Sequence, residues 1–169
     1  MAKTSFTRKQ IESNIETDRK DTQEKNTDNE RSVFDAEIER KTLNSLEGGT
    51  EDGLEEVIEN LNQAQDISSN EFEEGTNLLH VKHGEIQEHK DEINDGLERS
   101  EKDDENIDST IAEINSESAK SSLESARESV QQDMELLNES MQQEEQIEEQ
   151  SNEMNQEQMQ RLKTAIGEN

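Results

Sequence analysis

Cysteine and proline are both absent from this chain of 169 residues. Without cysteine the protein has neither disulfide bonds nor thiol chemistry, and its redox compartment is left open. Without proline, a helix is spared the residue that most often interrupts it. Disordered chains are usually enriched in proline, so this absence also counts against general disorder.

Apolar side chains are scarce, at 25% hydrophobic and 2% aromatic residues. A globular domain is typically about 45–50% apolar, so we expect no compact core of ordinary size, and disorder of the free chain stays an alternative. No window approaches the roughly 18 apolar residues of a membrane-spanning helix. No apolar run follows the basic residues near Met1, which predicts cytoplasmic synthesis without a signal peptide.

Basic residues are scarce too: the chain has 17 of them and 45 acidic residues, so its net charge is -28. This balance argues against nucleic acid, which is bound through lysine and arginine, and against an anionic lipid surface. A basic protein surface would be attracted. Salt screens like charges, so we predict helicity that rises with ionic strength. The same balance suits a salt-loaded cytoplasm, and halophilic adaptation is therefore one hypothesis for it.

What the chain does contain is a long amphipathic pattern over 107–166. Apolar residues recur there in steps of three and four, which places them on one stripe of a helix. So narrow a stripe needs another helix to cover it. The predicted packing seam comprises Ile107, Ile111, Ile114, Leu123, Val130, Met134, Leu137, Met141, Leu162 and Ile166 in this part of the chain.

The apolar residues of the N-terminal part predict a helix over 7–46, although 16–32 contains no apolar residue. A continuous helix would have a polar inner face in this stretch, and a flexible linker is the alternative. The polar residues on that face would be those that continue the rhythm after Ile15, namely Asp18, Thr22, Lys25 and Asn29.

A chain reversal is predicted at 47–53, where Gly48, Gly49 and Gly53 interrupt the pattern. Glycine ends helices by adopting the left-handed conformation, and Thr50 is a suitable cap for a following helix. Because short loops join antiparallel neighbours, the next helix should fold back on the first. That helix carries the remaining members of the packing seam, which are Leu54, Val57, Ile58 and Leu61.

Leu46, Glu47 and Gly48 form a Leu-x-Gly motif at this reversal. A helical hairpin with such a turn is similar to the secreted helical hairpins of type VII secretion systems, whose turn carries Trp-x-Gly or Leu-x-Gly. The tryptophan is absent here, and the C-terminal stripe lies outside the resemblance. We therefore do not assign the chain to that family.

Two further interruptions are predicted. A capping-box pattern with a following glycine predicts a break over 68–77. An acidic cluster makes the seam polar over 100–106, which predicts either a hinge or a polar layer that sets helix register, and we favour the hinge. The chain then divides into an N-terminal helical hairpin region, 1–77, and a long helical segment, 78–169.

Residues suited to catalysis or metal binding are few. His80 and His83 would share a helix face near Glu85, the minimum for a weak metal site, but no cysteine or ordered second shell supports them. The stretch from Asp103 is similar to a calcium loop but lacks its glycine and its final glutamate. Phosphate loops and nucleophile elbows are absent. We expect no catalytic residue, no cofactor, no metal site and no enzymatic activity.

The sequence therefore predicts an all-α protein without β-sheet, an elongated helical hairpin followed by a long coiled-coil-like helix. One chain has too little apolar surface to cover such a seam, so we expect packing against other protein helices, by self-association or in a larger assembly. The leading hypothesis is a non-enzymatic structural or assembly component of a multi-protein particle, such as a virion, filament or secretion machine. The alternative is an acidic secreted or chaperone-like binding module that folds on a basic protein partner.

Overall fold

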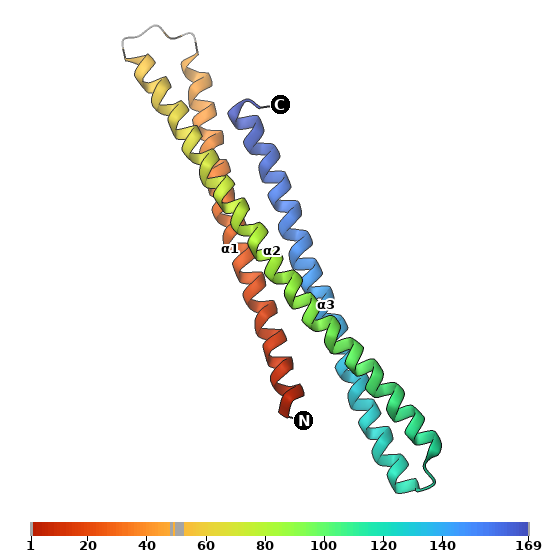
Figure 1. The fold of residues 1–169 in the computed structure, drawn as a ribbon. Helices are drawn as coiled ribbons and strands as arrows, with labels where there is room; N and C mark the ends of the chain where they lie inside the picture. Colours follow the sequence, from red (N-terminus) through yellow and green to blue (C-terminus); the bar gives the residue numbers. More distant parts are fainter. Residues whose placement is uncertain (1, 48, 50–52, 169) are drawn as a thin grey trace. The chain divides into compact units, whose positions relative to one another are not determined.

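The computed structural model describes residues 2–47, 49 and 53–168, with side chains from residue 8 onward. These residues form three helices, α1 (Ala2–Leu46), α2 (Leu54–Glu113) and α3 (Glu117–Ile166), which Figure 1 traces in chain order. Within this part of the chain there is no strand, so the all-α prediction is confirmed. None of the described helices combines the length and apolarity that crossing a bilayer requires.

α1 continues without a break through 16–32, so the flexible linker considered for this stretch is wrong. Its inner face is polar, as the continuous-helix prediction required. Lys25 is only half-buried, and the neighbouring Asn26 takes the inner position instead. The buried polar residues of α1, each at most 6% exposed, are Asp18, Thr22, Asn26, Asn29 and Ser32.

α2 continues through 68–77, where a break was predicted, and through 100–106, where a hinge or a polar layer was predicted. The predicted break over 68–77 is therefore wrong, whereas the choice between a hinge and a polar layer over 100–106 stays a prediction. Ser68 donates a hydrogen bond from Oγ to Glu39 of α1 at 3.2 Å rather than capping a helix. Asp104 pairs with Arg127 of α3. The division of the chain at residue 77 stays a prediction.

The prediction of one long helix over 107–166 is wrong in one respect, because residues 114–116 are not helical and connect α2 to α3. Ser116 caps α3, because its Oγ accepts a hydrogen bond from the Ala119 N–H at 3.4 Å. Glu117 adds a negative charge to the first turn, where the helix dipole favours it. One signal was visible in the sequence: the apolar step from Ile114 to Ala119 is five residues, which breaks the rhythm of three and four.

Of the glycines that the structure describes, two adopt the left-handed backbone that ends or precedes a helix. Gly53, with φ of 91°, lies directly before α2. Gly167, with φ of 81°, follows α3, and Glu168 closes the helix end by donating its N–H to the Lys163 carbonyl at 2.8 Å. At the predicted reversal, the Gly49 N–H donates to the Leu46 carbonyl at 3.1 Å. Gly48 and residues 50–52 lie outside the described residues.

The chain forms two compact units, each built from one segment of every helix. Unit 1 comprises Met1–Asp18 and Glu85–Gln146, and unit 2 comprises Arg19–Gly84 and Ile147–Asn169. In unit 2, side-chain contacts join residues 125 positions apart in α1 and α3, so these two segments run parallel. The α2 segment of unit 2 runs antiparallel to α1, since Asp21 pairs with Lys82 and Glu39 with Ser68.

The two units bury apolar side chains to different degrees. Unit 2 holds an apolar cluster made of Val33, Ala36, Phe72, Leu162 and Ala165, against which Met159 and Ile166 pack. The buried apolar residues of unit 1 are Ile11, Ile15, Ile86 and Ile93. Over 94–143, which is the rest of the α2 segment, the turn and most of the α3 segment, no side chain is fully buried. In unit 1 the side chains of the α2–α3 hairpin therefore stay at least partly exposed over 94–143.

Candidate functional site

The packing seam predicted from the sequence is only partly covered by this chain. Leu162 is buried at 5% exposure, whereas Val57 is exposed at 45%. The other members are half-buried, and they are Leu54, Ile58, Leu61, Ile107, Ile111, Ile114, Leu123, Val130, Met134, Leu137, Met141 and Ile166. The seam thus keeps apolar surface in contact with solvent within the described chain.

Further apolar side chains outside the predicted seam point into solvent. The most exposed in unit 2 are Val81, at 63%, and Ile67, at 59%. Both residues belong to apolar patterns of the sequence, but neither is a member of the predicted packing seam. The other large exposed apolar residues are Phe34, Ile38, Leu78, Leu136 and Met154.

Unit 1 has an open cleft of about 330 Å³. Two members of the predicted seam, Val130 and Leu137, line it together with Ile11 of α1. Arg8 and Asp133, which form an ion pair between α1 and α3, also line the cleft. The cleft therefore joins apolar seam residues to a charged border, a combination that suits contact with another amphipathic helix.

The interior of unit 2 is partly polar, and amides satisfy its backbone groups. Gln65 of α2 donates Nε2 to the carbonyls of Ala36 and Ala165, at 3.3 and 3.0 Å. Gln158 of α3 donates Nε2 to the Asn26 carbonyl at 2.8 Å. Such contacts form only at one helix register, so we expect these buried amides to fix the alignment of the three segments.

Arg161 of α3 joins two carboxylates of α1 in unit 2. Its Nε and Nη2 both lie 2.9 Å from Glu37 oxygens, and its Nη1 lies 2.6 Å from Glu30 Oε1. The hydrogen bond that Arg161 donates lowers the pKa of Glu30, and the hydrogen bonds that Arg161 donates to Glu37 and Glu30 raise its own pKa. This planar, two-pronged pairing is a geometry that lysine cannot reproduce.

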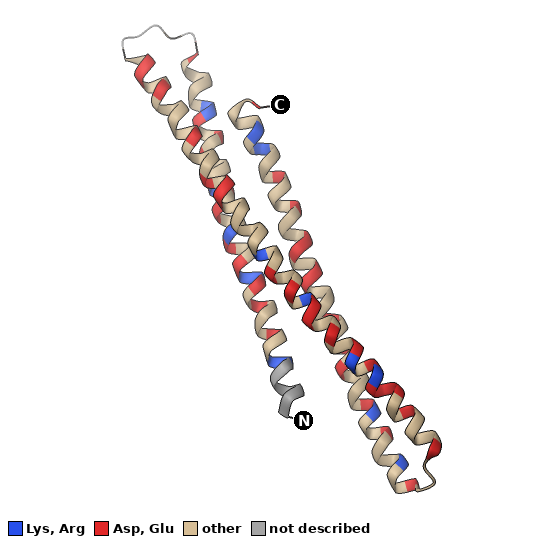
Figure 2. Cartoon of the chain, viewed as in Figure 1, with Lys and Arg blue, Asp and Glu red and all other residues tan. Residues whose placement is uncertain are grey.

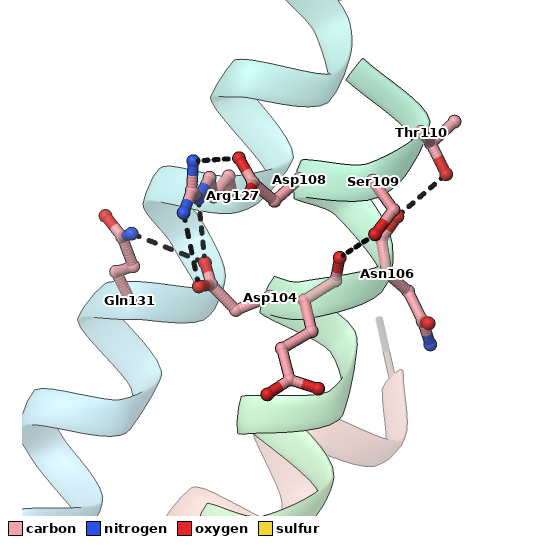
Figure 3. A network of polar contacts seen from close by, with 8 residues as sticks. Asp104, Asn106, Asp108, Ser109, Thr110, Arg127 and Gln131 are labelled. Atoms are coloured by element: carbon pink, nitrogen blue, oxygen red, sulfur yellow. Dashed lines mark hydrogen bonds and ion pairs between the residues drawn. The ribbon is translucent and has the colours of Figure 1, made fainter. Parts of the chain in front are cut away.

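Arg127 of α3 makes the corresponding contact in unit 1, opposite two aspartates of α2, as Figure 3 shows. Its Nε lies 3.0 Å from Asp104 Oδ1 and its Nη1 lies 2.8 Å from Asp108 Oδ1. Gln131 also donates to Asp104, at 3.3 Å. The hydrogen bond to Asp104 raises the pKa of Arg127. The acidic stretch, for which either a hinge or a polar layer was predicted, thus carries contacts between α2 and α3.

One group of metal-ligating side chains forms in unit 1, with one residue from each helix: Asp18, His89 and Glu144. The His89 Nδ1 lies 2.5 Å from Asp18 Oδ2 and 3.9 Å from Glu144 Oε1. Both carboxylate side chains are 0% exposed, and His89 is 22% exposed. The sequence pattern did not reveal this group, because its members are far apart along the chain. The sequence held one signal for this group. Asp18 lies three residues after Ile15, and Glu144 lies three residues before Ile147, so each polar residue falls on the helix face that the apolar residues define.

The histidines that the sequence analysis weighed lie elsewhere. His80 is exposed, and His83 lies with Nε2 3.0 Å from Ser151 Oγ in unit 2. Burial lowers the pKa of His83, which the charge of Glu148 partly opposes. Among the residues that the structure describes, the metal-ligand group contains His89 and neither of these two.

Acidic residues lie along all three helices, with isolated lysines and arginines between them, as Figure 2 shows. The net charge of -28 is thus distributed along the helices rather than gathered in one tail. A surface of this kind repels other copies at low ionic strength and is screened by salt.

Comparisons of the chain with protein-family models, with curated proteins and with solved structures found no match.

Proposed function

We propose that this protein is a non-enzymatic structural or assembly component of a multi-protein particle, and that it acts by packing its helices against other helices. The observation that carries the proposal is the α2–α3 hairpin over 94–143, in which no side chain is fully buried. An apolar seam that its own chain covers only in part gains free energy when another helix excludes the remaining water.

The occupant we propose for this seam is a helix of a second copy of the chain. The surrounding charge opposes such a contact, because each copy carries a net charge of -28. Screening removes most of that repulsion, since the Debye length falls from about 8 Å at physiological salt to about 3 Å at 1 M. Self-association should therefore be weak at low salt and strong at high salt.

Sedimentation of the full chain tests this proposal. We expect a defined oligomer with high helicity in molar NaCl, and a shift toward smaller species as the salt is diluted. Circular dichroism in the same series should show helicity that rises with salt. A chain that stays monomeric at every salt and protein concentration would contradict the proposal.

A matched pair of variants locates the interface. Leu123 is a half-buried seam residue of the hairpin, and Ser122 beside it is exposed. Leu123→Glu should abolish the high-salt oligomer, because it places a charge in the apolar contact. Ser122→Glu adds the same charge and should leave the oligomer intact. Helicity of both variants is measured alongside, so that loss of folding is distinguished from loss of association.

The distributed acidic surface favours a second candidate, a binding module that folds on a basic protein partner. In that case the free chain should be a poorly helical monomer even in molar NaCl. Titration with a basic polypeptide such as polylysine should then raise its helicity at low salt. The two candidates thus differ in the state of the free chain, which the same sedimentation series measures.

A further inference from the structure

We propose that Asp18, His89 and Glu144 form a binding site for one divalent transition-metal cation of the Zn²⁺ class. Each helix contributes one ligand, and one oxygen or nitrogen of each residue lies within 4.8 Å of those of the other two. The site goes beyond the assembly role proposed above and does not depend on it.

Charge is the first reason for this assignment. Two carboxylates with no exposed surface lie around one imidazole. Buried charges in proteins are either paired or coordinate metals, and a divalent cation carries twice the positive charge of an imidazolium.

Geometry is the second reason. Ligand atoms 2.0–2.1 Å from a tetrahedral zinc ion are about 3.4 Å apart. The separations from His89 Nδ1 to the two carboxylates, 2.5 and 3.9 Å, lie on either side of that value. Each of these two separations differs from 3.4 Å by less than 1 Å, and the ligand atoms of Asp18 and Glu144 lie within 4.8 Å of each other. The partly exposed His89 marks the side from which an ion and a water ligand can enter.

The donor set selects the class of metal. Imidazole nitrogen favours Zn²⁺, Fe²⁺, Ni²⁺ and Cu²⁺ over Mg²⁺ and Ca²⁺, which prefer oxygen alone. The many surface carboxylates of this chain offer oxygen only, so they should hold divalent ions weakly and with little preference. A bound ion would also join all three helix segments of unit 1, the unit with the sparser apolar packing.

The test is calorimetric titration of the chelator-treated full chain with Zn²⁺ in an excess of Mg²⁺, which occupies the surface carboxylates. We expect one Zn²⁺ per chain and a rise in thermal midpoint on binding. Titration with Co²⁺ should give the visible absorption of an ion held by nitrogen and oxygen ligands. Absence of stoichiometric binding under these conditions would overturn the proposal.

Matched histidine variants assign the site. His89→Ala should weaken Zn²⁺ binding by more than about 100-fold, because it removes a direct ligand and outer-shell losses alone reach that size. His80→Ala removes an exposed histidine of the same helix and should leave binding unchanged. Asp18→Asn and Glu144→Gln should each weaken binding and alter the Co²⁺ spectrum.

Circular dichroism reports whether each variant stays helical, and the three ligand positions provide independent variants in case one does not fold. Zn²⁺ binding that survives in a folded His89→Ala chain would show that only adventitious surface binding occurs. The oligomeric state is measured separately, so a failure of this site and a failure of the assembly role are distinguishable.

Discussion

Unit 2 buries an apolar cluster, whereas most of the α2–α3 hairpin in unit 1 buries no side chain fully, although the same three helices build both units. In unit 1, α1 contributes the buried Ile11 and Ile15 near Ile86 and Ile93 of the same unit, but no side chain is buried over 94–143. In unit 2, α1 supplies Val33 and Ala36, which lie in one cluster with Phe72 of α2 and Leu162 of α3. Apolar periodicity on two helices is therefore not enough to bury their side chains fully. Full burial requires a third helix segment with small or apolar residues at the same level.

The largest expected effect is on the apolar cluster of unit 2. Leu162→Ala should lower the free energy of unfolding by about 3 kcal/mol, because the site is nearly closed to water. Leu123→Ala, in the same helix but in unit 1, should cost about 1 kcal/mol, since Leu123 is already half exposed. Urea unfolding followed by circular dichroism measures both. Equal losses would remove the distinction between the units.

Glycines of α2 should respond with opposite signs in the two units. A Cβ on Gly75 would lie 1.9 Å from Oδ1 of the buried Asn29, so Gly75→Ala should cost about 1–2 kcal/mol despite the better helix propensity of alanine. A Cβ on Gly96 would meet Leu137 at an ordinary 3.4 Å. Gly96→Ala should therefore stabilise by about 0.5–1 kcal/mol. Thermal unfolding of both variants tests the signs.

The ion pairs of Arg161 in unit 2 and Arg127 in unit 1 should differ less in their contributions to the free energy of unfolding. Arg161→Ala should cost about 0.5–1 kcal/mol at neutral pH, a value kept small because Glu30 is 46% exposed. The folded-state pKa of Glu30 lies below its ordinary 4.5, so its share of this stability is present above pH 4.5 and is lost as the pH falls through the folded value.

Urea unfolding of wild type and Arg161→Ala at neutral and acidic pH measures that share. The unit 1 counterpart, Arg127→Ala, should have a smaller effect, since Asp108 is 63% exposed. A loss for Arg161→Ala that does not diminish in acid would contradict the assignment to Glu30.

The smallest expected effect concerns His83. Burial lowers its folded-state pKa below the ordinary 6.5, so the folded chain binds fewer protons than the unfolded chain as the pH falls through that range. The contribution of His83 is therefore fully present above pH 6.5 and declines below it. The stability difference between wild type and His83→Gln should shrink from pH 7 to pH 5.5. A difference that grows on acidification would mean that His83 is stabilised as the cation.

Much of the secondary structure followed from the sequence. The steps of three and four, the absence of proline and the glycines near Gly53 predicted helices and the first reversal. The polar inner face of α1 was also predictable, because the rhythm continues from Ile15 through Asp18, Thr22 and Asn29. Local geometry and periodicity determine such features, and both can be read from a single chain.

The second reversal was missed because Asn115 and Ser116 carry no strong breaker signal, and a five-residue step is easily read as a small irregularity. The break predicted over 68–77 was wrong, because Ser68 makes a contact between helices instead of capping one. A cap and an interhelical contact use the same residue types, so only the position of the neighbouring helix separates them.

What the sequence by itself determined is a helical chain with a net charge of -28 and too few apolar residues for an ordinary core. What only the tertiary structure decided is which distant residues meet, including Asp18 with His89 and Glu144, and Arg161 with Glu37. The reason is physical: periodicity specifies which face of a helix turns inward, but the register and direction of its neighbours specify which side chains share that interior.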